Sequence, residues 1–517
     1  MAARGRLFWL RWLEAAALAS AAVVVCYALA SGSARRHYDV DEIQHTHVMW
    51  RISVGDRPFH DFVESHPPFV WYLGAPLLRW APSPERAITG FRVLASISGI
   101  LFLALALASA RAGQRSLEVP WLLAGGLLVL SEKKNLDYFL EARPDSFAYS
   151  LLFAAFLLFL REKPERLLFR YMIFAFLAST ALLLTPKFVV LVVVFALADL
   201  VLLRRTKDAA LAALAGHAAG IALALLAALS FLRAAGIDPL LAYDLSIGFH
   251  ERFLSTTAFS QGLLRSVREQ PVQLACFLAG VASWLGLALA RRVRSTAFEI
   301  AVLSFLCASA LMVPLPYKQY FVPWFALSAI FVAFAGAGLR TMGENVPRLA
   351  LAGLLGFAII SGARAASEYR KFDQVRFFHD LWDLMARAAR PEGRVVADPQ
   401  WHPIYRRDVF YGWFSTFDPG GKGQEWTLRE WNPRGIGARF TGEGYRSEIE
   451  SRPPALIVTV GDGFNLPAVQ EEAVAEYVRA HRDLYLALPI AGELGLLVRR
   501  DQANWDYLEQ TGRGRRR

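Results

Sequence analysis

Apolar runs long enough to cross a lipid bilayer recur along the first 366 of the 517 residues. Crossing a bilayer core of about 30 Å takes roughly 20 apolar residues in a helix. Hydrophobic residues make up 55% of the sequence, which is too apolar for a soluble protein of this length. We therefore predict an α-helical polytopic membrane protein with about 11 transmembrane helices. The expected spans are 8–31, 88–110, 119–131, 144–160, 168–184, 187–203, 209–233, 271–290, 297–313, 320–338 and 349–366.

Arginine and lysine residues gather in every second loop between these runs. The clusters are Arg4, Arg6 and Arg11; Arg111 and Arg115; Arg161, Lys163, Arg166 and Arg170; Arg204, Arg205 and Lys207; Arg291, Arg292 and Arg294; Arg340 and Arg348. By the positive-inside rule these loops are cytoplasmic. The N-terminus is then cytoplasmic, and the chain after residue 366 lies on the extracytoplasmic side of the cytoplasmic (inner) membrane. Eleven spans satisfy this alternation, whereas ten would place the C-terminal segment on the wrong side.

Charge and cysteine content argue against two other kinds of protein. The net charge of +11 does not indicate a nucleic-acid partner, because the basic residues form short clusters instead of one stripe. Cys26, Cys276 and Cys307 all fall in predicted spans, so no disulfide framework or cysteine-based metal site is indicated. Small residues at 30–34 resemble a signal-peptidase site, but the length of the first apolar run favours an uncleaved anchor.

The composition changes abruptly after the last predicted span. Residues 367–517 are rich in charge, Trp and Pro, and contain no run long enough to cross a membrane. Their periodicity predicts helices at 375–389 and 468–480 and buried strands at 394–397, 455–460 and 494–498. We therefore expect two domains, a transmembrane domain at 1–366 and a soluble extracytoplasmic α/β domain at 367–517.

The first predicted outer loop concentrates acidic and imidazole groups at the membrane surface. Its first part contains Asp39, Asp41, Glu42 and His45, and its second part contains Glu64 and His66 ahead of Pro67-Pro68. If a helix begins near Asp41, His45 lies one turn away on the same face, and Glu42 points about 100 degrees aside. A carboxylate with an imidazole nearby suits a general base or a metal-assisted site. The alternative is a solvated loop in which these side chains only cap helices.

Three further polar islands are predicted to face outward. Arg143 and Asp145 flank Pro144 at the start of a span, where an aspartate is also favoured by the helix dipole alone. Lys187 lies in a break between two apolar runs, where it could neutralise a phosphate or simply anchor the interface. Lys318 and Tyr320 lie in the last such island, which also fits an aromatic belt.

An Asp-Glu pair just after the first span, followed by Pro-Pro leading into a segment rich in Phe, Trp and Tyr, resembles the GT-C glycosyltransferases. More narrowly, the chain resembles the polyprenyl-phosphate-sugar enzymes that include protein O-mannosyltransferases and lipid A aminoarabinose transferases. The resemblance implies Asp41 as catalytic base with Glu42 beside it, and Asp145 near the acceptor or a metal. It also implies Lys187, Lys318 and Tyr320 at the donor lipid phosphate. His66 stands where the family commonly has a lysine, which is a departure from its pattern.

These features together predict inverting transfer of a sugar from a polyprenyl-phosphate-linked donor. The acceptor would be a lipid, a glycan or a protein, and membrane lipids would surround the enzyme. Asp39, Asp41, Asp145 and the nearby histidines could assemble a divalent-cation site, but nothing in the sequence fixes metal use. A transporter or lipid flippase is the main alternative, because charges near a membrane can also mark a translocation path. A protein that binds a partner through its outer domain is a third possibility.

Overall fold

The structure is a computed structural model. It describes residues 2–64, 66–160, 167–186, 189, 192–193, 207–248, 270–290, 322–343, 345–371, 374–412 and 437–513. The chain divides into two compact units, each assembled from separate stretches of sequence. We call Met1–Arg36, Arg92–Ala228 and Leu254–Phe372 the helical unit, and His37–Phe91, Leu229–Phe253 and Asp373–Arg517 the mixed unit.

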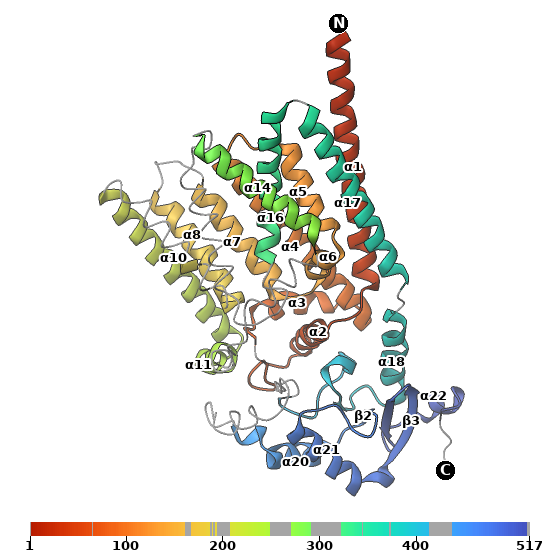
Figure 1. Ribbon diagram of the computed structural model, residues 1–517. Helices are drawn as coiled ribbons and strands as arrows, with labels where there is room; N and C mark the ends of the chain where they lie inside the picture. The colour runs from red at the N-terminus through yellow and green to blue at the C-terminus, as the bar shows by residue number, and fades with distance from the viewer. Residues whose placement is uncertain are drawn as a thin grey trace. The chain divides into compact units, whose positions relative to one another are not determined.

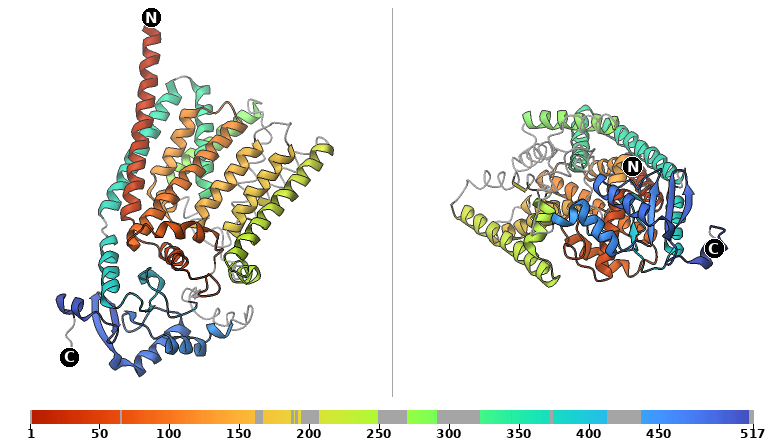
Figure 2. Two further views of the ribbon diagram at one scale, coloured as in Figure 1. Left: turned by 180° about the vertical axis from the view of Figure 1, so that it is seen from behind. Right: turned by 90° about the horizontal axis from the view of Figure 1, so that it is seen from below.

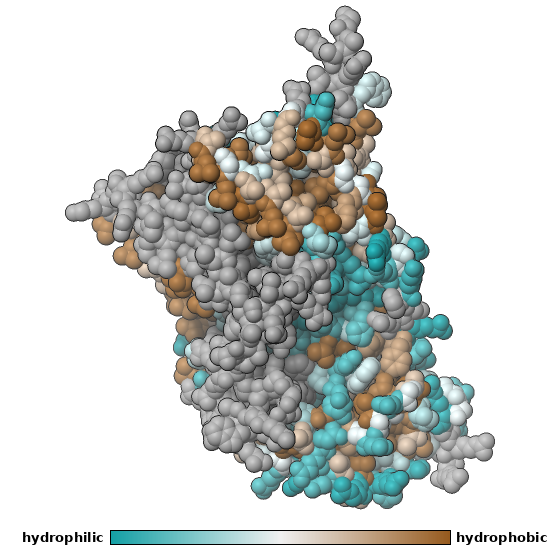
Figure 3. Space-filling view, in the orientation of Figure 1, coloured by the Kyte–Doolittle hydropathy of each residue, from teal (hydrophilic) through white to brown (hydrophobic). Residues whose placement is uncertain are grey.

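The helical unit is a bundle of apolar helices, among which α1 packs on α17, α7 on α8, and α14 on α16 (Figures 1 and 2). Hydrophobic residues gather on its visible described face (Figure 3), as expected where lipid is the solvent. Its helices are α1 (Ala2–Arg35), α4 (Pro84–Gly113), α5 (Val119–Ser131), α6 (Lys133–Leu140), α7 (Pro144–Leu160), α8 (Leu167–Leu184), α10 (Lys207–Ala234), α14 (Pro271–Leu289), α16 (Val322–Leu339) and α17 (Asn345–Lys371). The first residues of α4 and the last residues of α10 belong to the mixed unit.

Most of the predicted spans coincide with one of these helices. The exceptions are 297–313, which lies outside the described residues, and 187–203, which lies mostly outside them. Within the described part of the chain, seven helices are long and apolar enough to cross a membrane, and α5 and α7 are shorter apolar helices. The structure thus supports a multi-pass membrane protein, and the count of eleven spans stays a prediction.

Glycines allow α14 and α16 to approach each other closely. A Cβ atom added to Gly280 of α14 would overlap the backbone carbonyl of Phe331 in α16. Without a hydrophobic driving force between helices in lipid, such close backbone contact supplies much of the packing energy. Gly280 is therefore a contact residue of the bundle.

We expect Gly280→Val to destabilise the protein by about 1–3 kcal/mol, because the larger side chain forces the two helices apart. Gly286 lies on the same helix with nothing within 4 Å of an added Cβ, so Gly286→Val is the matched control. Thermal unfolding of both variants in one detergent compares them. Equal melting temperatures for the two variants would contradict the close packing.

The mixed unit contains a four-stranded sheet in the order β1-β2-β4-β3. β1 is parallel to β2, and the other neighbours are antiparallel. The strands are β1 (Val395–Val396), β2 (Leu456–Val460), β3 (Tyr485–Ala491) and β4 (Leu494–Arg499). The helices are α2 (Val40–Ser53), α3 (Phe69–Leu78), α11 (Pro239–Tyr243), α18 (Gln374–Ala388), α20 (Gly442–Ser451), α21 (Ala468–Ala480) and α22 (Trp505–Gln510).

Strands β1, β2 and β4 and helices α18 and α21 confirm the elements predicted within 367–517. The sequence did not predict β3, which contains Pro489. Proline cannot donate to a sheet ladder and is tolerated at edges and bulges. Here β3 is an edge strand, and its register shifts between Pro489 and Ala491.

Two hydrophobic cores, one on each face of the sheet, include residues from the first predicted outer loop. Tyr38 and Ile43 share a core with Trp382 of α18 and with strand residues such as Leu456. A second core contains Phe59, Val63 and residues of 229–253 together with Val396 and Ile457. Neighbouring strand residues point to opposite faces, so β1 and β2 contribute to both cores. Residues 37–91, which the sequence assigned to the transmembrane domain, thus fold in one compact unit with 373–517.

Candidate functional site

The start of α2 is fixed by two of the predicted acidic residues. Asp39 is the N-cap, and its carboxylate accepts the Asp41 backbone N–H at 3.0 Å. The Glu42 carboxylate accepts the Asp39 backbone N–H at 3.0 Å, which completes a capping box. These contacts give Asp39 and Glu42 a structural role. Asp41, at the second helical position, is partly exposed, whereas every residue from Glu42 to Met49 is buried.

His45, Glu64 and His66 form one cluster behind the helix start. His45 lies one turn after Asp41 in α2, as the sequence predicted, and its Nδ1 accepts the Trp71 indole N–H at 3.1 Å. The Glu64 carboxylate lies 2.8 Å from Nδ1 of His66 and accepts from the Gln44 amide at 2.5 Å. The His45 and His66 rings are 5.0 Å apart.

Burial tends to raise the pKa of Glu64, but hydrogen bonds from His66 and Gln44 and the charges of the histidines lower the pKa below its usual value. A buried ionised carboxylate against a partly exposed imidazole can hold or relay a proton. Three of the five residues that the sequence offered as acceptor or metal candidates, His45, Glu64 and His66, therefore lie together.

The remaining described candidates belong to the helical unit. Asp145 lies in the first turn of α7 and, with Arg143, lines a small pocket shared with Tyr138 and Tyr149. Arg143 Nε is 2.8 Å from one Glu141 oxygen, and Arg36 Nη2 is 2.7 Å from the other. Sequence reasoning missed Arg36 and Glu141 as partners, because the two residues are far apart in the chain. Lys187, Lys318 and Tyr320 lie outside the described residues.

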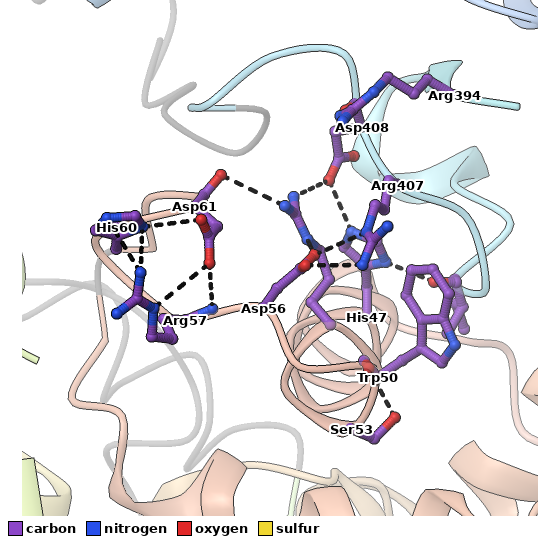
Figure 4. A network of polar contacts seen from close by, with 12 residues as sticks. His47, Trp50, Ser53, Asp56, Arg57, His60, Asp61, Arg394, Arg407 and Asp408 are labelled. Carbon is purple, nitrogen blue, oxygen red and sulfur yellow. Dashed lines mark hydrogen bonds and ion pairs between the residues drawn. The ribbon is translucent and has the colours of Figure 1, made fainter. Parts of the chain in front are cut away.

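A buried ionic cluster that the sequence did not predict lies on the second half of α2 (Figure 4). Asp408 Oδ2 is 2.8 Å from His47 Nε2 and 2.9 Å from Arg51 Nη1, and Asp408 Oδ1 is 2.9 Å from His402 Nε2. All four side chains are buried. His47 and Arg51 at i and i+4 were the available signal, but their partners lie more than 350 residues later. We call His47, Arg51, His402 and Asp408 the α2 clamp.

Three clamp residues could hold a metal ion, because ligand atoms of His47, His402 and Asp408 lie within 4.8 Å of one another. Their hydrogen bonds suit a different arrangement. His402 Nδ1 accepts the Ile404 backbone N–H at 3.1 Å, so the ring proton resides on Nε2, the nitrogen that faces Asp408. Arg51 also contacts the carboxylate oxygen that a cation would share. The contacts present thus neutralise Asp408 without a metal.

We expect the clamp to make stability fall in mild acid. Burial, and secondly the charge of His47, lower the pKa of His402 to about 4, whereas the unfolded value is 6.5. Between these pH values the unfolded chain binds a proton that the folded chain does not, so the free energy of unfolding falls by about 3 kcal/mol as pH decreases. Asp408 acts in a lower pH range. Burial tends to raise its pKa, but the adjacent His47 and His402 lower the pKa below the usual value, so the stability that Asp408 contributes is lost only below its unfolded pKa of 3.8.

Thermal unfolding from pH 7 to pH 4 measures this dependence. The neutral variant His402→Gln should show a flatter profile, because the titrating group is gone. A wild-type profile that is flat across this range would contradict a neutral, buried His402.

The fold resembles that of solved structures of ArnT, which confirms the expected resemblance at the level of fold. ArnT from Cupriavidus metallidurans, a lipid A aminoarabinose transferase, matches in its apo state with TM-score 0.56 and 13% identity over 96% of this chain and 98% of that chain. The same protein bound to undecaprenyl phosphate matches with TM-score 0.54 and 14% identity over 92% and 97%. The oligosaccharyltransferase AglB from Archaeoglobus fulgidus gives TM-score 0.48 and 15% identity over 94% and 74%. No protein-family model and no curated protein sequence matches the chain.

Proposed function

We propose that the chain transfers a sugar from a polyprenyl-phosphate-linked donor to a lipid, glycan or protein acceptor, with inversion at the anomeric carbon. The reaction would take place at the outer face of the cytoplasmic membrane. Two findings support the proposal: the fold, and the crystal structure of ArnT with undecaprenyl phosphate. The single observation that carries the site is the start of α2, where capping engages Asp39 and Glu42 and Asp41 is left partly exposed.

In this mechanism Asp41 accepts the proton of the acceptor hydroxyl or amine. The acceptor atom attacks the anomeric carbon as the bond from that carbon to the phosphate oxygen breaks, and the electron pair leaves with the polyprenyl phosphate. Lys187, Lys318 and Tyr320 would stabilise the negative charge on that phosphate. Direct displacement inverts the anomeric configuration without a covalent sugar-enzyme intermediate. Residues 1–366 would carry the catalytic residues, and residues 367–517 would lie on the extracytoplasmic side of the membrane.

The site residues divide into two roles beyond the base. Asp145 and Arg143, with a pocket beside them, would orient the acceptor or donor sugar. Asp39, His45, Glu64 and His66 would support Asp41 or the acceptor from the mixed unit. A divalent metal would require carboxylate and imidazole ligands; ligand atoms of His47, His402 and Asp408 lie within 4.8 Å of one another, but their contacts with Arg51 and Ile404 favour an arrangement without an ion.

One observation favours the transporter alternative. Within the described helical unit, Asn135, Gln270, Gln273 and Ser328 form a buried hydrogen-bond network that links α6, α14 and α16. Polar residues inside a bundle can mark a translocation path. These side chains are uncharged and hydrogen-bond to one another. Hydrogen bonds of this kind between helices also stabilise membrane helix packing. The network therefore does not outweigh the GT-C fold.

The test uses full-length protein in lipid nanodiscs with a panel of radiolabelled polyprenyl-phosphate sugars and envelope extracts as acceptors. We expect one donor to give a labelled product of inverted anomeric configuration, identified by NMR. The same labelled lipids in proteoliposomes show whether the protein instead moves the lipid across the bilayer. Movement of lipid across the bilayer with no sugar transfer from any donor would support a flippase and overturn the proposal.

A further inference from the structure

We propose that Asp408 is a positioning residue that fixes the rotation and axial position of α2, and through α2 the orientation of the Asp41 carboxylate. This inference rests on the proposed function, because Asp41 is the proposed base. All the residues that carry it belong to the mixed unit.

The clamp holds one face of α2 at two successive turns. His47 and Arg51 are four residues apart, and both contact the same oxygen of Asp408. Arg51 also reaches Asp56 with Nε at 2.8 Å, and Asp56 in turn pairs with Arg407 at 2.9 Å. Two contacts along the helix axis, from His47 and from Arg51, restrain both rotation and sliding, which a single contact would not do.

The backbone of the Asp408 segment is shaped for this contact. Ile404 has a φ of 59°, in the left-handed region that β-branched residues rarely adopt. This conformation lets its carbonyl face His47 Nδ1 at 2.5 Å while its N–H donates to His402. A carbonyl oxygen and a carboxylate oxygen therefore face the two nitrogens of His47. Strained backbone persists only where surrounding contacts determine it, so the strain is an independent sign of a built interaction.

A small rotation of α2, allowed by a loosened clamp, would displace the Asp41 carboxylate from its reacting position. Asp41 lies six residues before His47, about 9 Å along the axis. A side-chain tip at the helix surface lies about 5–6 Å from that axis, so a rotation of about 10° moves it by about 1 Å. A displacement of 1 Å in a reacting geometry can cost about 10²-fold in rate.

We expect Asp408→Asn to lower kcat for sugar transfer by about 10- to 100-fold and to leave KM for the lipid donor within about twofold. Asp398→Asn is the matched control. Asp398 lies ten residues earlier in the same unit, caps Gln400 and contacts Asn465, and asparagine can replace it as a cap. Equal losses in both variants, or a normal kcat in Asp408→Asn, would overturn the inference.

Hydrogen–deuterium exchange of the full-length protein gives a readout that does not need activity. The α2 amides should exchange at least about tenfold faster in Asp408→Asn than in wild type or Asp398→Asn. If wild type transfers no sugar, the proposed function fails while the exchange rates still decide whether the clamp holds α2. If the α2 amides of Asp408→Asn exchange at the wild-type rate, the proposal that Asp408 restrains α2 is wrong, even if the protein transfers sugar.

Two further measurements distinguish an ionic clamp from a metal site. Adding Arg51→Gln to Asp408→Asn should not lower kcat or speed α2 exchange further, because Asp408→Asn has already removed the carboxylate that Arg51 holds in the clamp. Stoichiometric metal in the purified protein that is lost in His402→Gln would instead identify a metal site and overturn the clamp. If Asp408→Asn does not fold, His47→Gln leaves Asp408 paired with Arg51 and gives the same readouts.

Discussion

Replacing Asp41 with asparagine is expected to lower kcat for sugar transfer by about 10²- to 10⁴-fold, the usual contribution of a general base. Asparagine keeps the size and shape of the side chain and removes its ability to accept the acceptor proton. The capping box should survive, because it uses the Asp41 backbone N–H and the side chains of Asp39 and Glu42. Steady-state transfer with the donor found in the panel measures kcat and KM separately, and KM for the donor should change little.

The matched control for Asp41 is Asp238→Asn. Asp238 is also an aspartate at a helix start in the mixed unit, and its carboxylate caps Leu240 of α11. Asparagine replaces aspartate well as an N-cap, so this variant should retain wild-type rates. Equal transfer by Asp41→Asn and wild type would remove Asp41 as the base, whatever the activity of the control.

Replacing Glu141 with glutamine is expected to destabilise the protein by about 1–3 kcal/mol, because it removes the buried carboxylate between Arg36 and Arg143, although Arg36 keeps a second carboxylate, Asp137, at 3.3 Å. Glu141 lies between Arg36 and Arg143 at 2.7 and 2.8 Å, and all three side chains are at most 14% exposed. Thermal unfolding of wild type and variant in one detergent, monitored as loss of the monodisperse peak in size-exclusion chromatography, measures the change in stability.

A surface ion pair of the same unit provides the comparison for Glu141. Glu118 pairs with Arg340, and these side chains are 32% and 55% exposed. Exposed pairs contribute about 0–1 kcal/mol, so Glu118→Gln should melt close to wild type. Similar melting temperatures for the two glutamine variants would show that burial of the Glu141 pair carries no special weight.

The start of the proposed site could be predicted because its signals are local. An aspartate followed three residues later by a glutamate is a capping-box pattern, and α2 begins there. The i and i+4 spacing of Asp41 and His45 likewise needed only a helix. The role of each acid could not be predicted, because a capping carboxylate and a catalytic one have the same sequence signature. Only the folded geometry assigns Asp39 and Glu42 to the cap.

Hydropathy by itself determined that this chain crosses a membrane many times, because every buried backbone in lipid must hydrogen-bond within its own helix and so leaves a long apolar run. Tertiary structure alone decided that residues 37–91 fold with residues 373–517, and that Asp408 contacts α2. Such contacts depend on complementary charge and shape between segments hundreds of residues apart. No periodicity within either segment encodes them.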